Sequence, residues 1–504
     1  MTISRRHLIA SAPLAFAALG MGKAFAAGRE SWDMIVVGAG TAGIPAAIFA
    51  AQRGARVLLL EKSSQLGGTL WFSGGQMSAA GTRRQQALGI ADSPENHFND
   101  IMHISRGTAE PALVRRAVQE AAGTLDWLEA SGFIFDTQYP LDATGHEPYS
   151  ARRVWGGKER GISLLKLLET ELAKLSNKPV IRTDFEVQEL LLDVSGNVAG
   201  VRGQDDGGQT HDFRASQVIL ASGGYMSNPS MFADLNGIPQ YRAGWAPANN
   251  GIGVTLALSA GGHIRGKQNY LCDFGSIPMD TESPSSEFAR SNHHPQRRLP
   301  WEIWVNAKGQ RFVSEEEPSV DVRERALLGQ PDHRYWIVFD EEVLSSSPML
   351  VRSAPPGESR DWTIDELRAA FGDIPAFVKG DTIDELAERA GIAAEGLRAT
   401  IEQYNRATQS GSDAFGRKHM PRPIAKPPYY AIRHQGGTLI SMAGVAVDGD
   451  LRVIKPSGQA VGGLFAAGEL LGNGSLSGQA FCSGMMVTPA LSLGRWLGRT
   501  LPLG

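Results

Sequence analysis

The sequence predicts an α/β protein whose parallel sheet is interrupted by an inserted α+β domain. Three observations support this prediction. At residues 33–61 an apolar run leads through a glycine turn into an alanine-rich helix and a second apolar run. Apolar runs that end in glycine turns return at residues 217–225 and 461–469. Between them, from about residue 266 to residue 437, prolines, charges and tryptophans become more frequent, which indicates a domain of another kind.

Length and composition allow two domains and exclude several classes of protein. The chain has 504 residues, a net charge of −4 and an ordinary apolar fraction, so neither a nucleic-acid partner nor an acidic tail is indicated. Two cysteines exclude a disulfide scaffold. The sequence also lacks the C-x-x-C and C-x-x-C-H patterns, which excludes zinc ribbons, thioredoxin-type redox pairs and covalently attached c-type haem.

Residues 1–26 are predicted to be a signal peptide. Ser4-Arg5-Arg6-His7-Leu8-Ile9 is a twin-arginine pattern, a mildly apolar run follows it, and Ala24-Phe25-Ala26 suits cleavage. The apolar run is too short for a membrane span and contains Pro13, and no other segment reaches spanning length. We therefore expect a mature chain from about Ala27 that the twin-arginine pathway exports, already folded, to the periplasm. A frayed basic N-terminus is the alternative.

The opening turn carries the pattern Gly38-x-Gly40-x-x-Gly43, and Glu61 follows about 20 positions later. Gly38 lets the chain turn, Gly40 lets the backbone approach a pyrophosphate, and Gly43 lets the helix pack closely on the strand. The helix N-terminus offers free N–H groups to phosphates, and the acidic residue can bond a ribose hydroxyl. The pattern therefore predicts a Rossmann-type dinucleotide site rather than a glycine-rich turn without a ligand.

The remaining elements before the insertion follow in order. The glycine-rich segment 67–80 is too irregular for a helix or strand and can lie against a flat ligand. Amphipathic patterns predict helices over residues 92–104 and 110–130. The predicted strands are 185–193 and 198–202, which form a hairpin, and the buried strand 217–221, which ends in a glycine turn.

In the insertion and after it, the same signals predict a hairpin and three helices. The spacing of Asn306 and Gly309 predicts a hairpin turn within residues 299–315. Helices are predicted over residues 382–389, 394–408 and, as the long apolar end of the chain, 485–497. The strand and glycine turn at residues 461–469 return the chain to the first domain.

Further motifs complete a pattern that a known family shares. They are Glu61-Lys62, Gly67-Gly68-Thr69, Ser73-Gly74-Gly75-Gln76-Met77, Leu220-Ala221-Ser222-Gly223-Gly224-Tyr225, Val305-Asn306-Ala307-Lys308-Gly309-Gln310-Arg311-Phe312-Val313, Pro428-Tyr429-Tyr430-Ala431 and Gly463-Leu464-Phe465-Ala466-Ala467-Gly468-Glu469. With them the mature chain resembles flavoproteins of the fumarate reductase/succinate dehydrogenase superfamily, which includes soluble fumarate reductase-like enzymes, ketosteroid dehydrogenases and urocanate reductases. The resemblance implies an FAD-binding domain over residues 27–265 and 438–504, and a capping, catalytic domain over residues 266–437.

The resemblance also implies how FAD is bound. The attachment should be non-covalent, because Gly68 stands where some relatives have a flavin-linking histidine. Glu61 should bind the adenosine ribose, Glu469 the ribityl chain, and the amides of residues 484–487 the flavin C2 carbonyl. The family's Gly-Asp-Gly stands here as Gly251-Ile252-Gly253. The implied cofactor-binding residues are Gly38, Gly40, Thr41, Ala42, Gly43, Glu61, Lys62, Gly67, Gly68, Thr69, Ser73, Gly74, Gly75, Val187, Ser222, Gly223, Gly224, Gly468, Glu469, Gly484, Met486 and Val487.

The resemblance points to Arg298 as the proton-transfer residue, because it stands eight residues before the asparagine of the Val-Asn motif. Arginine is normally fully protonated, so we expect a relay with Asp273 as its partner; Arg297 is the alternative if the loop length differs. Fumarate reductases bind the substrate carboxylates with two histidines and another arginine, whereas the corresponding positions here are Asp273, Ile440 and Phe481. Burying a carboxylate against apolar side chains costs several kcal/mol, which argues against fumarate as the substrate.

Tyr270, Trp301, Ile440 and Phe481 are expected to line the substrate site. They favour a larger, less charged molecule, such as an enone, an aromatic or a ketosteroid-like ring. The tyrosine that ketosteroid dehydrogenases carry ahead of the last helix is replaced by Ala480. The expected activity is that of an FAD-dependent oxidoreductase that reduces or desaturates a carbon–carbon bond activated by a carbonyl or carboxyl group.

The other histidines and the cysteines are expected to have structural roles. His293-His294-Pro295 has no obvious third ligand, so no metal site is predicted. His146 and His434 are expected at the surface, with a place facing the substrate as the alternative. Cys272 and Cys482 are expected to be buried free thiols rather than a disulfide.

Electrons must come from or go to an external partner, because the chain has neither a second nucleotide pattern nor a haem motif. A cytochrome, a quinone-linked protein, another flavoprotein and oxygen are all open, and so is the direction of the reaction. The alternative function is a flavoprotein subunit that transfers electrons to a protein partner without a small-molecule site. Arg298 and the full capping domain favour an enzyme.

Overall fold

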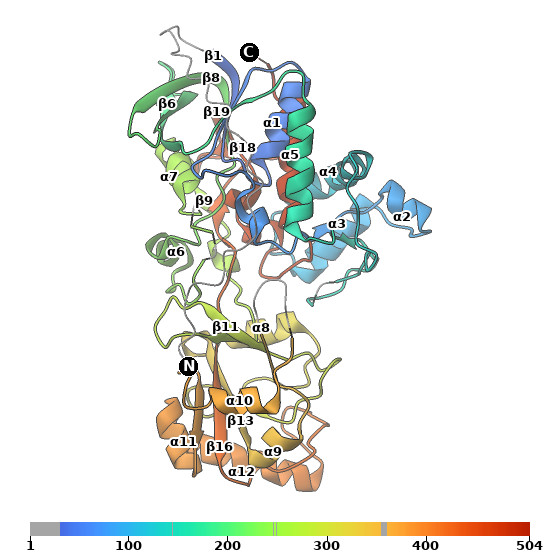
Figure 1. Ribbon diagram of the computed structural model, residues 1–504, viewed down its shortest axis with the longest axis vertical. Coiled ribbons are helices and arrows are strands. Elements are labelled where there is room, and N and C mark those ends of the chain that lie inside the picture. The colour runs from blue at the N-terminus through green and yellow to red at the C-terminus, as the bar shows by residue number, and fades with distance from the viewer. Residues whose placement is uncertain (1–30, 144, 245, 248, 354–359, 504) are drawn as a thin grey trace.

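In a computed structural model, residues 31–503 are described except 144, 245, 248 and 354–359. The predicted signal peptide, residues 1–26, lies outside this range. The described chain is elongated, with the large sheet in the upper half of Figure 1 and a smaller sheet in the lower half. None of its described helices combines the length and apolar character needed to cross a membrane.

A mixed sheet of eight strands organises the upper half. Its order is β18-β19-β8-β1-β2-β5, with β7 paired to β8 and β6 paired to β7. β1 is parallel to both β2 and β8, and β19 is parallel to β8, so segments from both ends of the chain meet in one parallel core, as predicted. The strands are β1 (Ser31–Val37), β2 (Val57–Leu60), β5 (Val180–Arg182), β6 (Glu186–Leu192), β7 (Val198–Gln204), β8 (Thr210–Leu220), β18 (Arg452–Ile454) and β19 (Ala460–Ala466).

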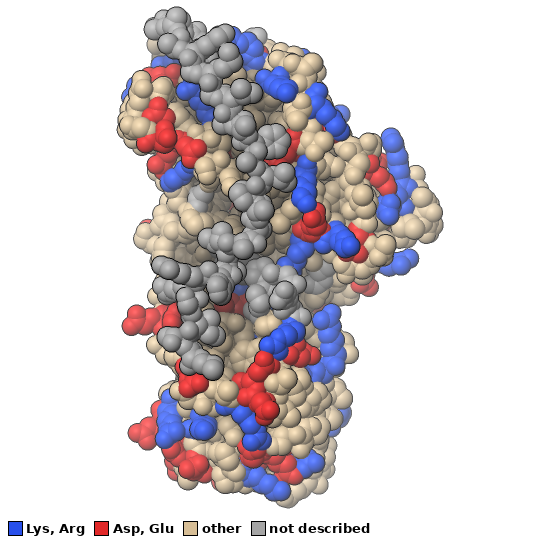
Figure 2. All heavy atoms as spheres, in the orientation of Figure 1, with Lys and Arg blue, Asp and Glu red and all other residues tan. Residues whose placement is uncertain are grey.

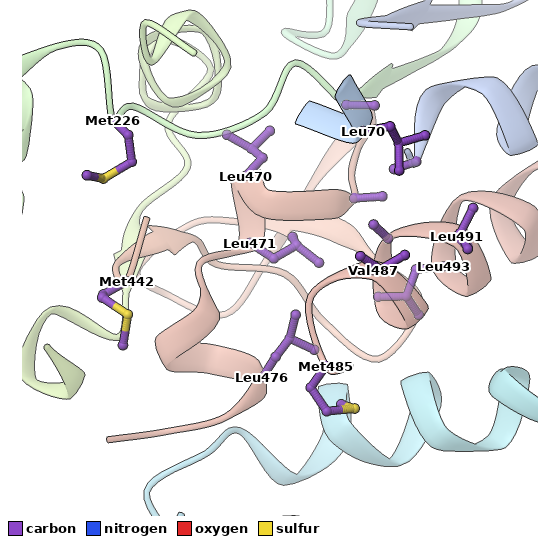
Figure 3. Packing of buried hydrophobic residues seen from close by; sticks show 14 of the residues in the cluster. Leu70, Met226, Met442, Leu470, Leu471, Leu476, Met485, Val487, Leu491 and Leu493 are labelled. Carbon is purple, nitrogen blue, oxygen red and sulfur yellow. The ribbon is translucent and has the colours of Figure 1, made fainter. Parts of the chain in front are cut away.

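Two small-residue helices cover the parallel core. α1 (Gly43–Gln52) packs on α14 (Val487–Thr500) so closely that a Cβ on Gly494 would lie 2.1 Å from the carbonyl oxygen of Ala42. Buried leucines, valine and methionines from the C-terminal segment pack with Leu70 and Met226 from the first half of the chain (Figure 3). The other elements of this half are α2 (Arg83–Ala87), α3 (Pro94–Ile104), α4 (Pro111–Ala130), α5 (Gly161–Lys174), α6 (Pro229–Asn236), α7 (Ile252–Ser259), α13 (Asn473–Leu476), β3 (Met77–Ser78), β4 (Val154–Trp155), β9 (Ile264–Arg265) and β17 (Gly444–Val445).

The lower half is built from the inserted segment. An antiparallel sheet of order β12-β13-β16-β15 has a hydrophobic core of its own, which includes Ile303, Trp336, Val338 and Leu386. A three-stranded sheet, β10-β11-β14, lies between this sheet and the upper half (Figure 1). The elements are β10 (Ser276–Pro278), β11 (Glu287–Ser291), β12 (Ile303–Val305), α8 (Val320–Leu328), β13 (Arg334–Asp340), α9 (Glu341–Ser346), β14 (Val351–Ser353), α10 (Ile364–Ala370), β15 (Phe377–Gly380), α11 (Ile383–Ala390), α12 (Ala394–Ser410) and β16 (Tyr429–Gln435).

The chain enters and leaves the insertion at one place. The backbone N–H of Asp273 donates to the carbonyl oxygen of Gly437 at 2.7 Å, and the Gly437 N–H donates back to the Asp273 carboxylate at 3.1 Å. Directly outside these residues, Arg265 of β9 pairs with Gly444 of β17. The two crossing segments therefore run side by side.

Most predicted elements are present with small shifts at their ends. The Asn306 turn forms as expected, since the Asn306 N–H bonds the carbonyl oxygen of Gln310 at 2.9 Å. The final helix begins at Val487 rather than at Met485, after Gly484 in the left-handed region at φ 80°. Figure 2 shows acidic and basic side chains interspersed over the described part of the visible face, in keeping with the small net charge.

Candidate active site

The turn between β1 and α1 is shaped by its three glycines in different ways. A Cβ on Gly38, at φ 102°, would lie 2.5 Å from the carbonyl oxygen of Ala221, and one on Gly43 would lie 1.8 Å from that of Gly38. A Cβ on Gly40 would meet no described atom closer than 4.0 Å. Gly38 and Gly43 are therefore required by the protein's own packing, whereas the space beside Gly40 is open to a ligand.

Glu61 closes this turn from the end of β2. Its carboxylate accepts hydrogen bonds from the N–H groups of Ala39 and Ser63, both at 2.8 Å. The side chain is buried, yet it forms part of a cavity wall. These bonds fix the carboxylate beside the glycine turn, where the dinucleotide fingerprint places the ribose.

A cavity runs along the carboxyl ends of the parallel strands, where ligands bind in open α/β sheets. Most of the predicted cofactor residues line it: Gly38, Gly40, Thr41, Ala42, Glu61, Lys62, Gly68, Thr69, Ser73, Gly74, Gly75, Val187, Ser222, Gly223, Gly468, Glu469, Gly484, Met486 and Val487. Gly43, Gly67 and Gly224 do not line it, because each allows close packing behind the wall. A Cβ on Gly224, for example, would lie 1.9 Å from Ser441 Oγ.

Several polar groups in the cavity wall fit a bound dinucleotide. Glu469 accepts hydrogen bonds from both the N–H and the hydroxyl of Ser441 at 2.9 Å and from Asn249 Nδ2 at 3.3 Å, and burial raises its pKa. Ser222 Oγ and Asn249 Oδ1 are buried without a hydrogen-bond partner in the described part of the chain. Such atoms cost free energy unless a ligand or water satisfies them. The sequence did not single out Asn249 or Ser441, although each lies within two residues of a residue that it did.

The N-terminus of α14 also points to a polar ligand. Met486 and Val487 line the cavity, and no side chain caps this helix end. Thr488 donates its N–H to the Gly484 carbonyl oxygen and Pro489 has none, so the N–H groups of Met486 and Val487 are the ones that could face an oxygen atom with negative charge. This is the placement expected for the flavin C2 carbonyl.

Comparison with known proteins decides which cofactor this site serves. A family model described as an FAD binding domain matches residues 33–484. The chain belongs to the FAD-dependent fumarate reductase-like superfamily. The probable fumarate reductase Ifc3 of Shewanella frigidimarina is 30% identical over 94% of this chain and 76% of its own length. The urocanate reductase of Eggerthella lenta is 30% identical over 88% of this chain and 70% of its own length.

Two further members of the superfamily widen the comparison. The vinyl phenol reductase of Lactiplantibacillus plantarum is 27% identical over 88% of this chain and 90% of its own length. The structure of the open conformation of a flavocytochrome c3 fumarate reductase has a TM-score of 0.68 at 26% identity, and the match covers 93% of this chain and 78% of that one. This superfamily member is thus an FAD-dependent oxidoreductase acting on CH–CH groups, with an FAD-binding domain and a capping domain.

Apolar side chains also belong to the cavity wall. They include Ile440 and Phe481, whose contact with substrate stays a prediction, and Phe72, Met226 and Leu439, which the sequence did not reveal. The charged residues in the described wall are Glu61, Lys62, Glu186 and Glu469. Lys62 and Glu186 form an ion pair of 2.7 Å with each other. No arginine or histidine belongs to the described part of the wall.

Arg298 is buried in the capping domain and is held by a carboxylate that the sequence did not identify. Its guanidinium makes two parallel bonds to Glu302, at 2.9 and 2.8 Å, and Nε donates to the Pro348 carbonyl oxygen at 3.0 Å. Burial alone would raise the pKa of Glu302, but the charge and hydrogen bonds of Arg298 outweigh it and hold that pKa below its usual value. The neighbouring Arg297 is exposed.

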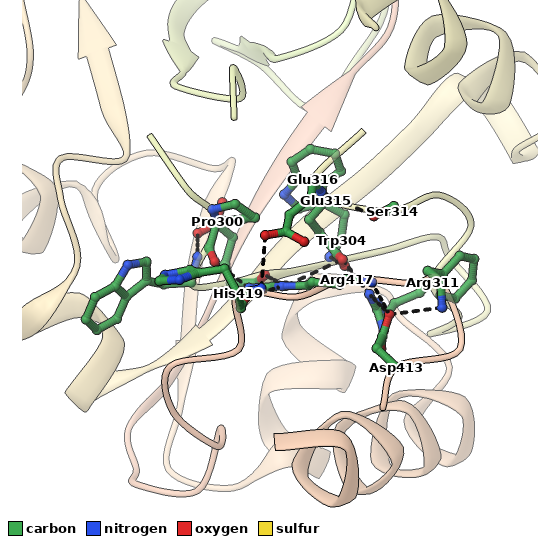
Figure 4. A network of polar contacts seen from close by, with 12 residues as sticks. Pro300, Trp304, Arg311, Ser314, Glu315, Glu316, Asp413, Arg417 and His419 are labelled. Atoms are coloured by element: carbon green, nitrogen blue, oxygen red, sulfur yellow. Dashed lines mark hydrogen bonds and ion pairs between the residues drawn. The ribbon is translucent and has the colours of Figure 1, made fainter. Parts of the chain in front are cut away.

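A buried polar network fixes the segment that carries this pair (Figure 4). Arg417 donates to the carbonyl oxygen of Glu302 at 2.6 Å and pairs with Glu315 at 3.4 Å. Glu315 in turn accepts from the Trp304 N–H at 3.1 Å and from Arg311. Residues 298–304 are therefore anchored from two directions.

The expected Arg298–Asp273 relay is not what the structure shows. Asp273 forms ion pairs with Arg242 at 2.5 Å and Arg290 at 3.0 Å, beside its backbone pairing with Gly437. Burial would raise the pKa of Asp273, but these two arginines lower it. Asp273 thus ties the crossing segments together, and the two cations satisfy its charge better than Arg298, which is already bound to Glu302.

Tyr270 and Trp301 are not among the described residues that line the cavity. Tyr270 is buried with its ring stacked on His333, at 5.6 Å between centroids, and Trp301 lies edge-on to His419 at 5.9 Å. Both pack inside the protein because other rings of the capping domain offer them apolar partners. Their role in substrate binding stays a prediction.

His434 was expected at the surface, but the structure buries it. His434 is fully buried on β16, where Nδ1 donates to the Ile432 carbonyl oxygen and Nε2 accepts from the Ser291 hydroxyl at 2.7 Å. His293 is buried beside it. His146 lies between the domains, with its ring 4.3 Å from that of Phe481. The prediction of buried free thiols at both cysteines is confirmed.

Proposed function

We propose that this oxidoreductase acts on a carbon–carbon bond activated by a carbonyl or carboxyl group in a substrate that is larger and less charged than fumarate. The observation that carries the proposal is that apolar side chains, among them Ile440 and Phe481, line the cavity. A dicarboxylate against these side chains would lose its hydration, and the lysine of the described wall, Lys62, is already paired with Glu186. Burying a charge without a partner costs several kcal/mol. A planar apolar molecule gains free energy by the same burial.

The names of two of the reported relatives support this substrate class, while the other two are named as fumarate reductases. The urocanate reductase and the vinyl phenol reductase are named for molecules that join an unsaturated bond to an aromatic ring. FAD, when bound, supplies the hydride chemistry. The chain itself would orient the ring against Ile440 and Phe481 and exclude water from the reacting bond.

We propose Arg298 as the group that transfers the α-proton, with Glu302 rather than Asp273 as its relay partner. The bidentate bond keeps the guanidinium in one orientation. In the reductive direction Arg298 would give a proton to the α-carbon and regain one from solvent through Glu302, which leaves the carboxylate unchanged. We also propose that Tyr270 and Trp301 contact the substrate and that the capping domain covers the cavity.

A substrate panel tests the function. Enzyme-bound FAD would be reduced chemically under anaerobic conditions and mixed with cyclic enones, cinnamates, vinyl phenols, ketosteroids or fumarate, with reoxidation followed at the flavin absorbance. We expect at least one aromatic or cyclic compound to reoxidise the flavin at least about tenfold faster than fumarate. Fumarate as the best acceptor would contradict the proposal. Reaction with a redox protein alone would favour the electron-transfer subunit.

For electron exchange we propose an external redox partner, a cytochrome, a quinone-linked protein or another flavoprotein, that approaches the segment around Trp71 and Phe72. These side chains are 44% and 43% exposed, and Phe72 also lines the cofactor cavity. Exposed aromatic side chains of this kind are common at protein interfaces. Trp71→Ser should slow turnover with the partner but leave turnover with a small redox dye unchanged.

We also propose that residues 1–26 direct export by the twin-arginine pathway to the periplasm, and that the domains divide at 27–265, 266–437 and 438–504. The twin-arginine pattern supports the first, and the paired crossing at Asp273 and Gly437 supports the second. Replacing Arg5 and Arg6 together by lysine should leave the folded holoenzyme in the cytoplasm. Periplasmic enzyme in that variant would exclude this route.

A further inference from the structure

Between the two domains, one histidine and two carboxylates converge behind the substrate end of the cavity. His146 comes from the loop before β4 in the FAD-binding domain, and Asp321 and Glu324 come from α8 of the capping domain. The two acids are three residues apart and therefore share one face of the helix. Their three nearest ligand atoms all lie within 4.8 Å of one another.

The carboxylates of this cluster are buried but incompletely satisfied. His146 Nδ1 lies 3.1 Å from Asp321 Oδ1 and 3.9 Å from Glu324 Oε2, and the exposed fraction of the two acidic side chains is 0% and 3%. Asp321 Oδ2 and Glu324 Oε2 accept no hydrogen bond within the described residues. A buried carboxylate oxygen without a partner costs free energy that a bound cation would recover.

Within the described part of the chain, no lysine or arginine forms an ion pair with either carboxylate, and the charges of Arg323 and Arg290 act on Glu324 only over longer distances. Arg323, on the same helix, turns away and donates to the carbonyl oxygens of His293 and Ser319. Arg325 donates to the Gln479 carbonyl oxygen at 3.4 Å. Among the described residues, His146 is the only group within ion-pair distance of either carboxylate.

We propose that His146, Asp321 and Glu324 bind a divalent cation. One imidazole nitrogen and two carboxylates suit borderline or hard ions such as Mn²⁺, Fe²⁺ or Zn²⁺. Such ions bind these atoms at about 2.0–2.2 Å, which places neighbouring ligand atoms about 3 Å apart. The His146–Asp321 distance already has this value, and Glu324, whose Oε2 lies 3.9 Å from His146 Nδ1, would have to move closer.

The position of the site would allow a bound cation to link the two domains. The His146 side chain is 20% exposed, which leaves room for water ligands, and its ring is fixed against Phe481 at 4.3 Å. A cation would join the FAD-binding domain to the capping domain directly behind this substrate-facing ring. This inference does not depend on which substrate the enzyme takes.

Manganese binding to the untagged holoenzyme tests the proposal. After removal of metals with a chelator, Mn²⁺ would be titrated and the free ion followed by electron paramagnetic resonance, with Zn²⁺ as competitor. We expect one Mn²⁺ per chain and a melting temperature that rises with the ion concentration. His146→Gln and Asp321→Asn should each weaken binding by at least about tenfold.

Controls keep the test decisive. His211→Gln removes a histidine that also pairs with an aspartate, Asp205 at 2.8 Å. Among the described residues His211 belongs to no group of three ligand atoms close enough to hold a metal ion, so this variant should leave Mn²⁺ binding unchanged. If His146→Gln or Asp321→Asn loses FAD absorbance, Glu324→Gln replaces it as the variant that should weaken Mn²⁺ binding. Wild-type enzyme that binds neither ion at millimolar concentration would overturn the proposal, and so would equal binding by all the variants.

Discussion

At the scale of single residues, the three fingerprint glycines do different work although their spacing makes them look equivalent. Gly40→Ala adds a methyl group that meets no described atom closer than 4.0 Å, so the apoprotein should keep its stability while FAD affinity falls at least about tenfold. Gly43→Ala should instead destabilise the fold by about 1–3 kcal/mol or more, because its Cβ would lie 1.8 Å from a carbonyl oxygen.

FAD titration by fluorescence and urea unfolding of the apoprotein separate these two effects. Gly449→Ala is a matched control, since no described atom lies within 4 Å of its Cβ. If Gly40→Ala binds FAD as wild type does, the open space beside Gly40 does not hold the pyrophosphate.

Arg298 carries the second prediction. Arg298→Ala should retain FAD but lower kcat by about 10²–10⁴-fold, the usual contribution of a proton-transfer group. Glu302→Gln should lower kcat less, because the guanidinium loses its partner but stays in place. Arg297→Ala, which changes an exposed residue, should leave kcat within about twofold of wild type. Full turnover by Arg298→Ala with bound FAD would remove this assignment.

The sequence pointed to Arg298 but not to its ion-pair partner. The family resemblance points to Arg298 through its spacing to the Val-Asn motif, which is local, and Glu302 lies only four residues beyond Arg298. Asp273 looked equally suitable because its charge is visible in the sequence while its distance to other residues is not. Two arginines from distant segments take Asp273, and only the folded chain brings them there.

At the scale of elements, β16 and the segment that follows β11 contain buried histidines, His434 and His293, that should make the protein sensitive to acid. Burial lowers the pKa of His434 to about 3, with the nearby charge of Arg290 acting in the same direction and its bond to the Ile432 carbonyl oxygen opposing it. Burial likewise lowers the pKa of His293. Both are neutral in the folded protein at pH values where an unfolded histidine is charged.

The sign of the pH effect follows from this difference. Above pH 6.5 neither state binds the proton, so stability is complete; below it the unfolded state gains the proton first, and stability falls progressively toward pH 3. Each such histidine should cost about 1.4 kcal/mol of unfolding free energy per pH unit in this window. Urea unfolding at pH 7.5, 6 and 5 measures it. His434→Gln should flatten the dependence, whereas the exposed His103→Gln should not.

Elements with strong periodicity could be predicted from the sequence. Whether a polar side chain is buried was harder to predict, as His434 shows. The parallel strands are nearly continuous apolar runs, and α3, α4, α11 and α12 carry amphipathic patterns, so their existence was visible in the sequence. His434 was assigned to the surface because it is polar. It continues an alternation with Tyr430 and Ile432 on β16, and this period-two signal would have placed it on the buried face.

At the scale of the whole molecule, Asp273 holds the two domains at their junction, which gives the fourth prediction. Asp273→Asn removes its ion pairs with Arg242 and Arg290 and should lower the unfolding free energy by about 2–3 kcal/mol, since the carboxylate is only 22% exposed. Limited proteolysis should then cut the crossing segments sooner. Turnover per bound FAD should stay within about tenfold of wild type; a loss as large as that of Arg298→Ala would return Asp273 to the proton-transfer machinery.

The order of domains along the chain was predictable, but the way in which they meet was not. Glycine turns on both sides of a proline-rich segment indicate an insertion whatever its orientation. The convergence of His146 with α8 depends on contacts between residues some 175 positions apart. Those distances are set by packing, for which the sequence has no local signal.

The paired crossing has a consequence for how such enzymes diversify. Because the insertion begins and ends on adjacent residues, with Asp273 against Gly437 and Arg265 against Gly444, a different cap could be joined at the same two points without disturbing the cofactor sheet. Substrate scope could then change by exchange of a single module, while the half that carries the redox chemistry is inherited intact. A chimaera with the cap of a relative, joined at these positions, should retain FAD and acquire the relative's preference.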